Sequence, residues 1–353
     1  MATVKDLTRF LESIAPPSYQ ESYDNSGLIV GDPNMEITGV VTCLDSTEAV
    51  LDEALELGCN VVVAHHPIVF KGLKRFTGKS YVERVVMKAI KHDIAIYAIH
   101  TNLDNVYHQG VNARFAQQLG LNNTRILAPK ANLKKMITFA PDTHIHVVRQ
   151  ALFAAGAGTI GNAQQISHAS LGVGTNQESS GIAEVKLEII FAAAQQGQII
   201  NALQQAHPAT RVPYEISTIE NTNQLIGSGM IGELETAISA ADFLQQLKEK
   251  MQTGCIKHTA LLDRPIKKVA ICGGSGGFLL KNAIRAQADI FITADYKYHE
   301  FFDADGQIII ADIGHFESEQ YTIDLLYDLI SEKFSNFALH YTKVRTNPVF
   351  YLS

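Results

Sequence analysis

Features that would mark a membrane, secreted or disulfide-bonded protein are missing from this sequence of 353 residues. No uncharged run approaches the length that crosses a bilayer, and the first helical pattern carries Lys5, Asp6 and Arg9 where a signal peptide would have an apolar core. The four cysteines have no C-x-x-C spacing, and Cys43 and Cys272 lie in apolar, strand-like runs that favour buried thiols. These absences predict a soluble, cytoplasmic protein without a membrane partner.

An excess of positive charge is also missing. The formal net charge is −7, whereas a general nucleic-acid binder needs a basic field to neutralise phosphates, so nucleic acid is not an expected partner. The sequence has no G-x-S-x-G elbow, no cysteine near a histidine-bearing strand end, and no paired G-D-x-H and G-N-H-D/E segments. Serine or cysteine nucleophiles and the metallophosphoesterase pattern are therefore not indicated.

The outer thirds of the chain alternate between strands and helices. In the first third, strands are predicted at 37–45, 60–66 and 94–100, with helices at 46–57 and 81–92. In the last third, strands are predicted at 267–277, 289–300 and 307–315, with a long amphipathic helix from about 317 to 333. Asp45 is the predicted N-cap of the helix at 46–57. Continuous Val/Ile runs in this rhythm predict a mostly parallel sheet covered on both faces, and the similar spacing indicates a duplicated α/β domain.

The middle of the chain has a different order of predicted strands and helices. Residues 131–245 read as a β-α-β-β-α-β series, which is the ferredoxin-like arrangement of an α+β domain. The predicted organisation is therefore a discontinuous α/β domain at 1–130 and 246–353, interrupted by an inserted domain at 131–245. A length of 353 residues agrees with about two domains.

Two adjacent histidines, His65 and His66, follow one of the apolar strands. Imidazoles at the carboxyl ends of parallel strands are typical of a metal or catalytic site in an α/β protein. Because adjacent side chains of an extended chain point to opposite sides, the pair suits two metals better than one. Histidines that cap the sheet by hydrogen bonding would give the same pattern.

A second candidate pair, His315 and Glu319, lies about 250 residues later at the start of a predicted helix. The i, i+4 spacing places both side chains on one helix face, where the carboxylate can bridge two cations while the histidine holds one of them. The alternative is a helix N-terminal carboxylate favoured by the helix dipole, and Glu317 fits that role equally well.

Three further sites carry open alternatives. Asp104 is a candidate ligand and His100 a candidate proton carrier, although an Asx-turn that closes the strand would also explain the pattern. His299 follows a strand and is a candidate for proton transfer or substrate contact, or else a surface residue. The glycine-rich segment Gly273–Gly277 is predicted to form a tight turn beside the site, with anion binding by its N–H groups as the alternative.

Five motifs in order resemble the Nif-three-like dinuclear metal-centre family, whose members are often named GTP cyclohydrolase I type 2 homologs. They are DNSGLIVGD, AHHPIVF, YAIHTNLDN, GHFESE and TNPVFY, and the resemblance runs from about Asp24 to Tyr351. It includes an insert similar to the PII-like or CutA-like fold, as in the longer bacterial members. The resemblance implies five ligands to two metals, with Glu319 as the bridge: His65, His66, Asp104, His315 and Glu319.

The resemblance also implies a ring-shaped homohexamer whose metal sites open to the interior. Nitrogen and oxygen ligands suit two divalent metal ions, with zinc expected in vitro and iron or manganese as alternatives. Such a pair activates water, so the first hypothesis is a metal-dependent hydrolase acting on a nucleotide-like small molecule, for instance opening the imidazole ring of GTP, with His100 or His299 moving protons. The second is a non-enzymatic, metal-loaded hexameric ring with a regulatory or interaction role, in which the insert senses or gates.

Overall fold

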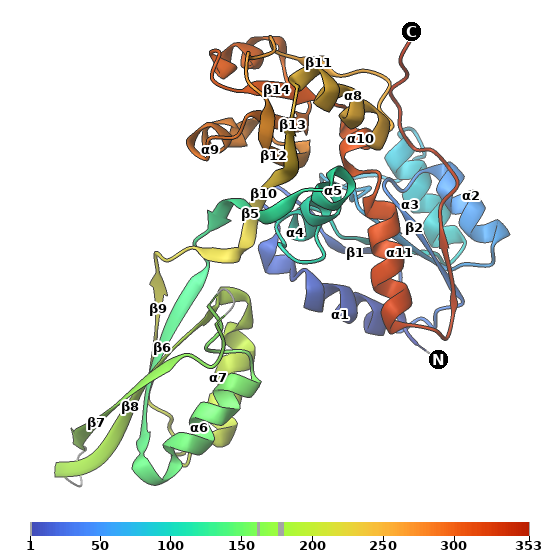
Figure 1. Cartoon of the computed structure of the whole chain (residues 1–353). Helices are drawn as coiled ribbons and strands as arrows, with labels where there is room; N and C mark the ends of the chain where they lie inside the picture. The colour runs from blue at the N-terminus through green and yellow to red at the C-terminus, as the bar shows by residue number, and fades with distance from the viewer. Residues whose placement is uncertain (1, 161–162, 176–179, 353) are drawn as a thin grey trace. The chain divides into compact units, whose positions relative to one another are not determined.

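The computed structural model describes residues 2–160, 163–175 and 180–352. It is a mixed α/β fold with several sheets, and it divides into two compact units (Figure 1). Unit 1 comprises Met1–Ala128 with Ile226–Ser353, and unit 2 comprises Pro129–Leu225. The predicted insert at 131–245 extends further, but residues 226–245 lie in unit 1 because the strand and helix that they form pack into its second sheet.

The first sheet of unit 1 has the strand order β1-β4-β3-β2-β15. Its strands are β1 (Gly27–Val30), β4 (Ala95–Ala98), β3 (Val61–Ala64), β2 (Gly39–Cys43) and β15 (Ala338–Tyr341). All neighbours are parallel except β1, which pairs antiparallel with β4. The parallel strands therefore end at one edge of the sheet, and His65 directly follows β3 at that edge.

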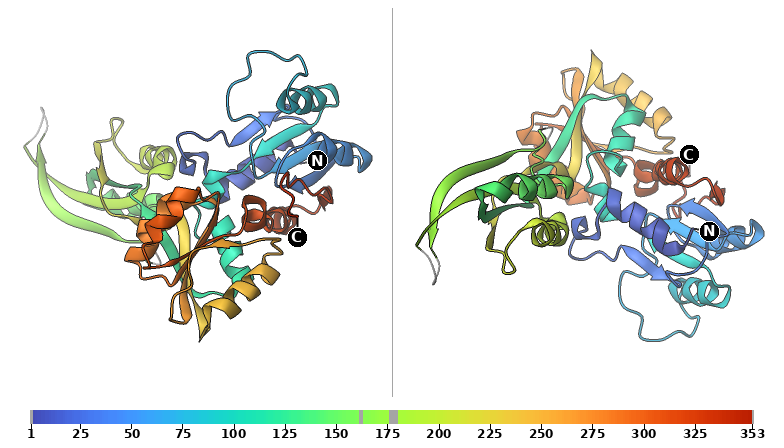
Figure 2. Two further views of the ribbon diagram at one scale, coloured as in Figure 1. Left: turned by 90° about the horizontal axis from the view of Figure 1, so that it is seen from above. Right: turned by 90° about the horizontal axis from the view of Figure 1, so that it is seen from below.

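Both faces of this sheet are covered, which explains the uninterrupted valine runs. Val61 and Val63 pack in one core with α1 (Val4–Ile14) and α11 (Thr322–Lys333). Val62 and Ala64 pack in another core with α2 (Glu48–Glu56) and α3 (Tyr81–Lys91), two helices that lie side by side (Figures 1 and 2). Alternate side chains of one strand thus enter two different cores.

The second sheet of unit 1 has the order β11-β14-β13-β12-β10-β5. Its strands are β11 (Lys257–His258), β14 (Ile309–Asp312), β13 (Ile290–Ala294), β12 (Ile266–Ser275), β10 (Asn223–Ile238) and β5 (Asn122–Lys130). The central strands β12, β13 and β14 are parallel. One face packs on α5 (Val111–Leu119) and α8 (Ala240–Lys250), and the other packs on α9 (Leu280–Arg285) and the 3₁₀ segment η4 (Tyr298–Ala304).

The predicted long helix at 317–333 is wrong, because two helices occupy this stretch. The short helix α10 (His315–Glu319) precedes α11, and the helical hydrogen-bond series is interrupted between them. At this break the side chain of Gln320 donates to the carbonyl of Met251, and the hydroxyl of Ser318 within α10 accepts from the N–H of Gly274. These contacts attach α10 to its surroundings in unit 1 independently of α11.

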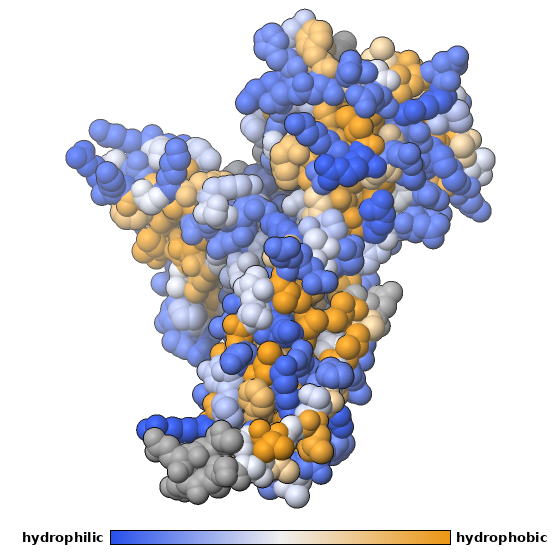
Figure 3. All heavy atoms as spheres, turned by 90° about the vertical axis from the view of Figure 1, so that its left-hand side faces the viewer, coloured by the Kyte–Doolittle hydropathy of each residue, from blue (hydrophilic) through white to orange (hydrophobic). Residues whose placement is uncertain are grey.

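Unit 2 contains β6 (Leu133–Pro141), α6 (Asp142–Ala154), β7 (Ser167–Thr175), β8 (Ser180–Ala192), α7 (Gln196–Ala206) and β9 (Tyr214–Ile219). This is the β-α-β-β-α-β order that the sequence predicts, and the sheet order is β7-β8-β6-β9, with all neighbours antiparallel. Buried residues of β6 and β8 pack with the two helices. Leu171 and Val173 on β7 are exposed, and Figure 3 shows apolar patches among polar residues on one face of the molecule. In the described residues, no helix combines the length and the apolar character that spanning a membrane requires.

Candidate metal centre

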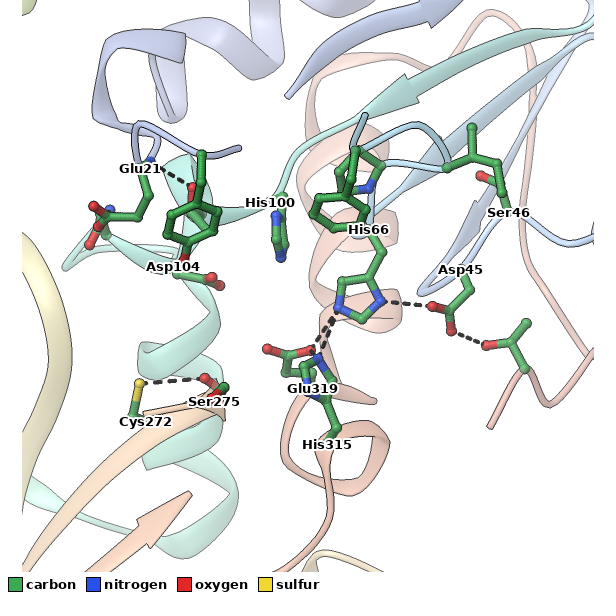
Figure 4. A pocket seen from close by; sticks show the side chains of 18 of the residues that line it. Glu21, Asp45, Ser46, His66, His100, Asp104, Cys272, Ser275, His315 and Glu319 are labelled. Carbon is green, nitrogen blue, oxygen red and sulfur yellow. Dashed lines mark hydrogen bonds and ion pairs between the residues drawn. The ribbon is translucent and has the colours of Figure 1, made fainter. Parts of the chain in front are cut away.

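Three segments of unit 1 bring histidine and carboxylate side chains together (Figure 4). His65 and His66 follow β3, Asp104 ends the short helix α4 (Thr101–Asp104), and α10 carries His315 and Glu319. Three overlapping groups could each hold a metal ion, namely His65/Asp104/Glu319, His66/His315/Glu319 and His65/His66/His100. The sequence-predicted ligands are therefore neighbours in space, although His66 and Glu319 are 253 residues apart in the chain.

The first group contains two buried atoms without a hydrogen-bond partner. Nδ1 of His65 lies 2.9 Å from the carbonyl oxygen of Ile99, so Nδ1 carries the proton and Nε2 presents a lone pair. Nε2 lies 3.6 Å from Oδ1 of Asp104 and 3.8 Å from Oε1 of Glu319. Both this Nε2 and Oδ1 of Asp104 are buried and unpartnered within the described residues. Burying an acceptor without a partner is unfavourable. A cation between these two facing acceptors would interact with both of them.

The second group shares Glu319 with the first. Oε2 of Glu319 lies 3.0 Å from Nε2 of His66 and 3.1 Å from Nε2 of His315. The two Nε2 atoms lie 3.3 Å apart. Glu319 thus presents Oε1 to one group and Oε2 to the other, and its side chain is 2% exposed, so solvent does not compete for either oxygen.

Each of the other three histidines near the centre is held at Nδ1 by a carboxylate. The pairs are His66 with Asp45 at 2.8 Å, His315 with Asp295 at 2.7 Å and His100 with Asp24 at 2.7 Å. Such partners fix the ring orientation and leave Nε2 for a metal or a proton. Sequence reasoning missed Asp24 and Asp45 in this role, although Asp24 opens the motif DNSGLIVGD and Asp45 lies two residues after β2, just as His66 lies two residues after β3.

Asp45 is not the helix cap that the sequence predicts. The hydroxyl of Thr47 accepts from the N–H of Val50 and caps α2, while Asp45 is engaged by His66. The C-terminal segment supports the same carboxylate, because Thr346 donates its hydroxyl proton to Asp45 over 2.6 Å.

The next residue of the C-terminal segment holds a second carboxylate near the centre. The side-chain amide of Asn347 donates to Glu317 over 2.9 Å. Glu317 is buried in this contact and belongs to none of the three groups that could hold a metal. Of the two carboxylates on α10, Glu319 is therefore the one that the structure places at the candidate centre.

Neighbouring carboxylates raise the pKa values of His315 and His66. The charge of Glu319 is the main influence that raises the pKa of His315, to about 11, and burial opposes it. Burial lowers the pKa of His66, but hydrogen bonds to Asp45 and Glu319 outweigh it and raise the pKa to about 9. Burial raises the pKa of Glu319, yet the charge of His315 and its hydrogen bonds bring that pKa well below its ordinary value.

Asp104 lies close to a second carboxylate, that of Glu319. Burial and then the charge of Glu319 raise its pKa to about 7. A carboxyl group that keeps its proton almost to neutral pH is one that a nearby cation would ionise. The donor set of imidazole nitrogens and carboxylate oxygens therefore fits divalent metal ions.

The two candidate proton carriers have different surroundings. The ring of His100 lies 5.2 Å from that of His65 and 5.3 Å from that of His66, and it points into the cavity above the centre (Figure 4). His299 is exposed on η4, contacts Tyr298, and is not among the described residues that line this cavity. The structure therefore brings His100, and not His299, to the site.

The glycine-rich segment Gly273–Gly277 forms a tight turn beside the centre. The N–H groups of Gly273, Gly274 and Gly276 donate to side-chain oxygens within unit 1, so they do not form an anion cradle. Gly274 has a φ of +61°, and a Cβ there would lie 2.4 Å from Oε1 of Glu319. Glycine is required here because it leaves room for the carboxylate.

A cavity of about 750 Å³ opens over the centre and has the size of a small-molecule site. His66, His100, Asp104, His315 and Glu319 contribute to its lining. Four aromatic residues also line the cavity: Tyr23, Phe70, Tyr81 and Phe278.

The fold and the site together define an α/β protein with a candidate metal centre of histidines and carboxylates at the strand ends. A model of the Duf34/NIF3 (NGG1p interacting factor 3) family matches residues 2–348. The chain therefore belongs to the Duf34/NIF3 family, as the motifs predict.

Relatives of known sequence and structure match most of the chain or nearly all of it. A protein of Halalkalibacterium halodurans named "GTP cyclohydrolase 1 type 2 homolog" is 36% identical over 332 residues, covering 89% of each chain. A Bacillus cereus protein related to NIF3 has a solved structure that matches with a TM-score of 0.86 and 34% identity, covering 99% of each chain. A Staphylococcus aureus structure matches with a TM-score of 0.82 and 31% identity, again covering 99% of each chain.

Proposed function

We propose that the centre holds two divalent metal ions and that the protein is a metal-dependent hydrolase acting on a nucleotide-like substrate. His65 and Asp104 would hold one ion, His66 and His315 the other, and Glu319 would bridge them. The observation that carries the proposal is the pair of buried, unpartnered acceptors, Nε2 of His65 and Oδ1 of Asp104, on one side of Glu319. Zinc is the expected metal in vitro, and iron or manganese suits the same ligands.

Two such ions supply Lewis acidity and a water molecule that is more easily deprotonated. His100 is placed to take up a proton. Its Nδ1–H donates a hydrogen bond to Asp24, and its Nε2 remains available on the cavity side. The carboxylate of Asp24 is itself fixed by the N–H of Thr101, so the orientation of His100 is set before a substrate arrives. His100 can then return the proton to a leaving nitrogen or oxygen.

The substrate class rests on two kinds of support. Relatives with 34–36% identity are named GTP cyclohydrolase 1 type 2 homolog, and a cyclohydrolase opens a heterocyclic ring with water. Aromatic side chains such as Phe70 and Phe278 line the cavity, where a planar ring can stack. A hydrolytic opening of a nucleotide-like heterocycle agrees with both.

The finer architecture also belongs to the proposal. The parallel strand series β2-β3-β4 and β12-β13-β14 support a duplicated α/β domain. The β-α-β-β-α-β order of unit 2 supports a ferredoxin-like, PII-like insert. We propose a homohexameric ring as the assembly, as the family resemblance implies.

Turnover by purified, metal-reconstituted protein tests the function. Wild type is expected to hydrolyse GTP or another member of a nucleotide and phosphoester panel, while a His65→Ala/Glu319→Ala double variant is expected to lose both metal and turnover. Equal rates for the two proteins would reject the hydrolase for those substrates. A wild type that retains metal without turnover would favour the non-enzymatic metal-loaded ring.

A further inference from the structure

We infer that the cavity above the centre takes an uncharged planar heterocycle, such as a nucleobase or a nucleoside, and discriminates against nucleoside triphosphates. The inference rests on the proposed function and narrows its substrate class. Two properties of the cavity wall carry it, namely the sign of its charged side chains and the exposure of its aromatic side chains.

His66 and His315 would be uncharged as metal ligands, and the other charged side chains of the cavity wall are acidic. Among the described residues that line it there is no lysine and no arginine, whereas Glu21, Asp45, Asp104 and Glu319 all contribute. The charge of two divalent cations would be reduced by Asp104 and Glu319, the two carboxylates that hold them. A triphosphate carries several negative charges and is usually bound by Lys, Arg and backbone N–H groups. The described lining offers no Lys or Arg, and the N–H groups of Gly273, Gly274 and Gly276 in the glycine-rich turn already donate to side-chain oxygens.

The loop that follows His66 in sequence carries cationic side chains that lie outside the cavity wall. The loop between His66 and α3 carries Lys71, Lys74 and Arg75, which are exposed and do not line the cavity. The end of this loop is fixed at α3, because the N–H groups of Thr77 and Lys79 both donate to Glu83. These three cations are the rival partners for a phosphate chain, and the experiment includes them for that reason.

The aromatic side chains of the wall are unusually exposed. Tyr23 is 70% exposed, Phe70 51%, Tyr81 60% and Phe278 68%, and they come from separate segments of unit 1. Large aromatic side chains are normally mostly buried, and a group of them around one cavity marks a binding surface. Phe70 also packs edge-on against His100, with ring centroids 5.7 Å apart, which connects this surface to the candidate proton carrier. Their flat faces suit a heterocycle and need no charge on the ligand.

Equilibrium binding of guanosine, adenosine, GTP and ATP to the full-length, metal-loaded protein tests the inference, with excess Mg²⁺ present so that the triphosphates do not remove the metals. At least one nucleoside is expected to bind, and its triphosphate is expected to bind no more tightly. A triphosphate that binds tenfold or more tightly than its nucleoside would overturn the inference. So would a failure of both nucleosides to bind. A Lys71→Ala/Lys74→Ala/Arg75→Ala variant is expected to bind the triphosphates as wild type does, and weaker triphosphate binding would also overturn it.

Two exposed phenylalanines give a matched pair of variants. Phe278→Ala is expected to weaken nucleoside binding about tenfold, which is the usual effect of removing one stacking partner. Phe302→Ala removes a phenylalanine with the same 68% exposure that does not line this cavity, and it is expected to leave binding unchanged. Equal nucleoside affinities of the two variants would overturn the inference.

The failure of this inference and that of the proposed hydrolase give different results. Nucleoside binding that depends on Phe278 without any turnover would retain the inference and reject the hydrolase. Metal-dependent turnover of GTP, with no binding or turnover of guanosine or adenosine, would retain the hydrolase and reject the inference.

Discussion

Nε2 of His65 and Oδ1 of Asp104 lie 3.6 Å apart, and within the described residues neither atom has a hydrogen-bond partner. The proton of His65 is on Nδ1, where the carbonyl of Ile99 accepts it, so both facing atoms are acceptors once Asp104 is ionised. Two buried acceptors that face each other destabilise a folded chain unless a cation lies between them. Metal binding at this pair would therefore stabilise the fold.

The substitution Asp104→Asn is expected to have opposite effects on the metal-free and metal-loaded proteins. The pKa of Asp104 is raised to about 7, so the folded metal-free chain loses stability as pH rises from the ordinary pKa of 3.8 to about 7. Asp104→Asn removes this loss and should stabilise the metal-free protein at pH 8 by on the order of 2 kcal/mol relative to wild type. Urea unfolding at pH 4 and pH 8 after chelation measures the difference.

The same variant is expected to lower the melting temperature of the metal-loaded protein, because an amide is a weaker and uncharged ligand. Destabilisation of the metal-free protein at pH 8 would contradict the assignment of Asp104 as a ligand. The comparison at pH 4 is the control, since both side chains are then largely uncharged and the difference should be small.

Metal content is expected to depend differently on Glu319 and His315. Glu319→Gln removes the carboxylate that contacts both ligand groups, so the purified protein should retain little metal. His315→Ala affects one group only, and about half of the wild-type metal content is expected to remain. Elemental analysis of reconstituted protein measures both values, and a full metal content in Glu319→Gln would contradict the bridging role.

The variant Gly274→Ala is expected to weaken metal binding more than a general glycine substitution does. Its Cβ would lie 2.4 Å from Oε1 of Glu319, and the φ of +61° adds backbone strain of about 1 kcal/mol or more. Gly306→Ala is the matched control, because its φ is +65° and a Cβ there meets nothing within 4 Å. Titration of both metal-free variants with zinc separates the steric effect from the backbone strain. Equal zinc affinities of the two variants would contradict the steric effect on Glu319.

Asp24→Asn is expected to reduce turnover by about tenfold or more while both metals stay bound. Asp24 contacts His100 over 2.7 Å, and His100 is not required by the two groups that contain Glu319. The change weakens the hydrogen bond that orients the His100 ring, so the rate should fall without loss of metal. Parallel rate and metal measurements check this, and a loss of both together would indicate a role in metal binding.

The strand ends could be predicted from the sequence because apolar runs and the polar residues after them are local patterns. His65 directly follows β3, and His100 lies two residues after the end of β4, as the apolar runs indicate. The exact ends of the strands are harder to predict from the sequence. The strand predicted at 289–300 ends at Ala294, because Asp295 adopts a φ of +60° and η4 begins three residues later. Local sequence contains no direct sign of that reversal.

The carboxylates behind the histidines could not be predicted in the same way. Asp45 precedes a helix and resembles an N-cap, but Thr47 supplies an equivalent oxygen, and the choice depends on His66, 21 residues away. Asp24 and His100 are 76 residues apart. Such pairs follow no periodicity, so only the folded arrangement of several segments reveals them.

The separation of 253 residues between His66 and Glu319 also has a consequence for biosynthesis. At roughly 5–20 residues per second, a ribosome needs about 10–50 s to make that length of chain. Throughout this interval His65 and His66 are present in the nascent protein without Glu319. A metal ion captured early would meet an incomplete set of ligands, so in the proposed two-metal centre the final metal would be selected only after α10 has emerged.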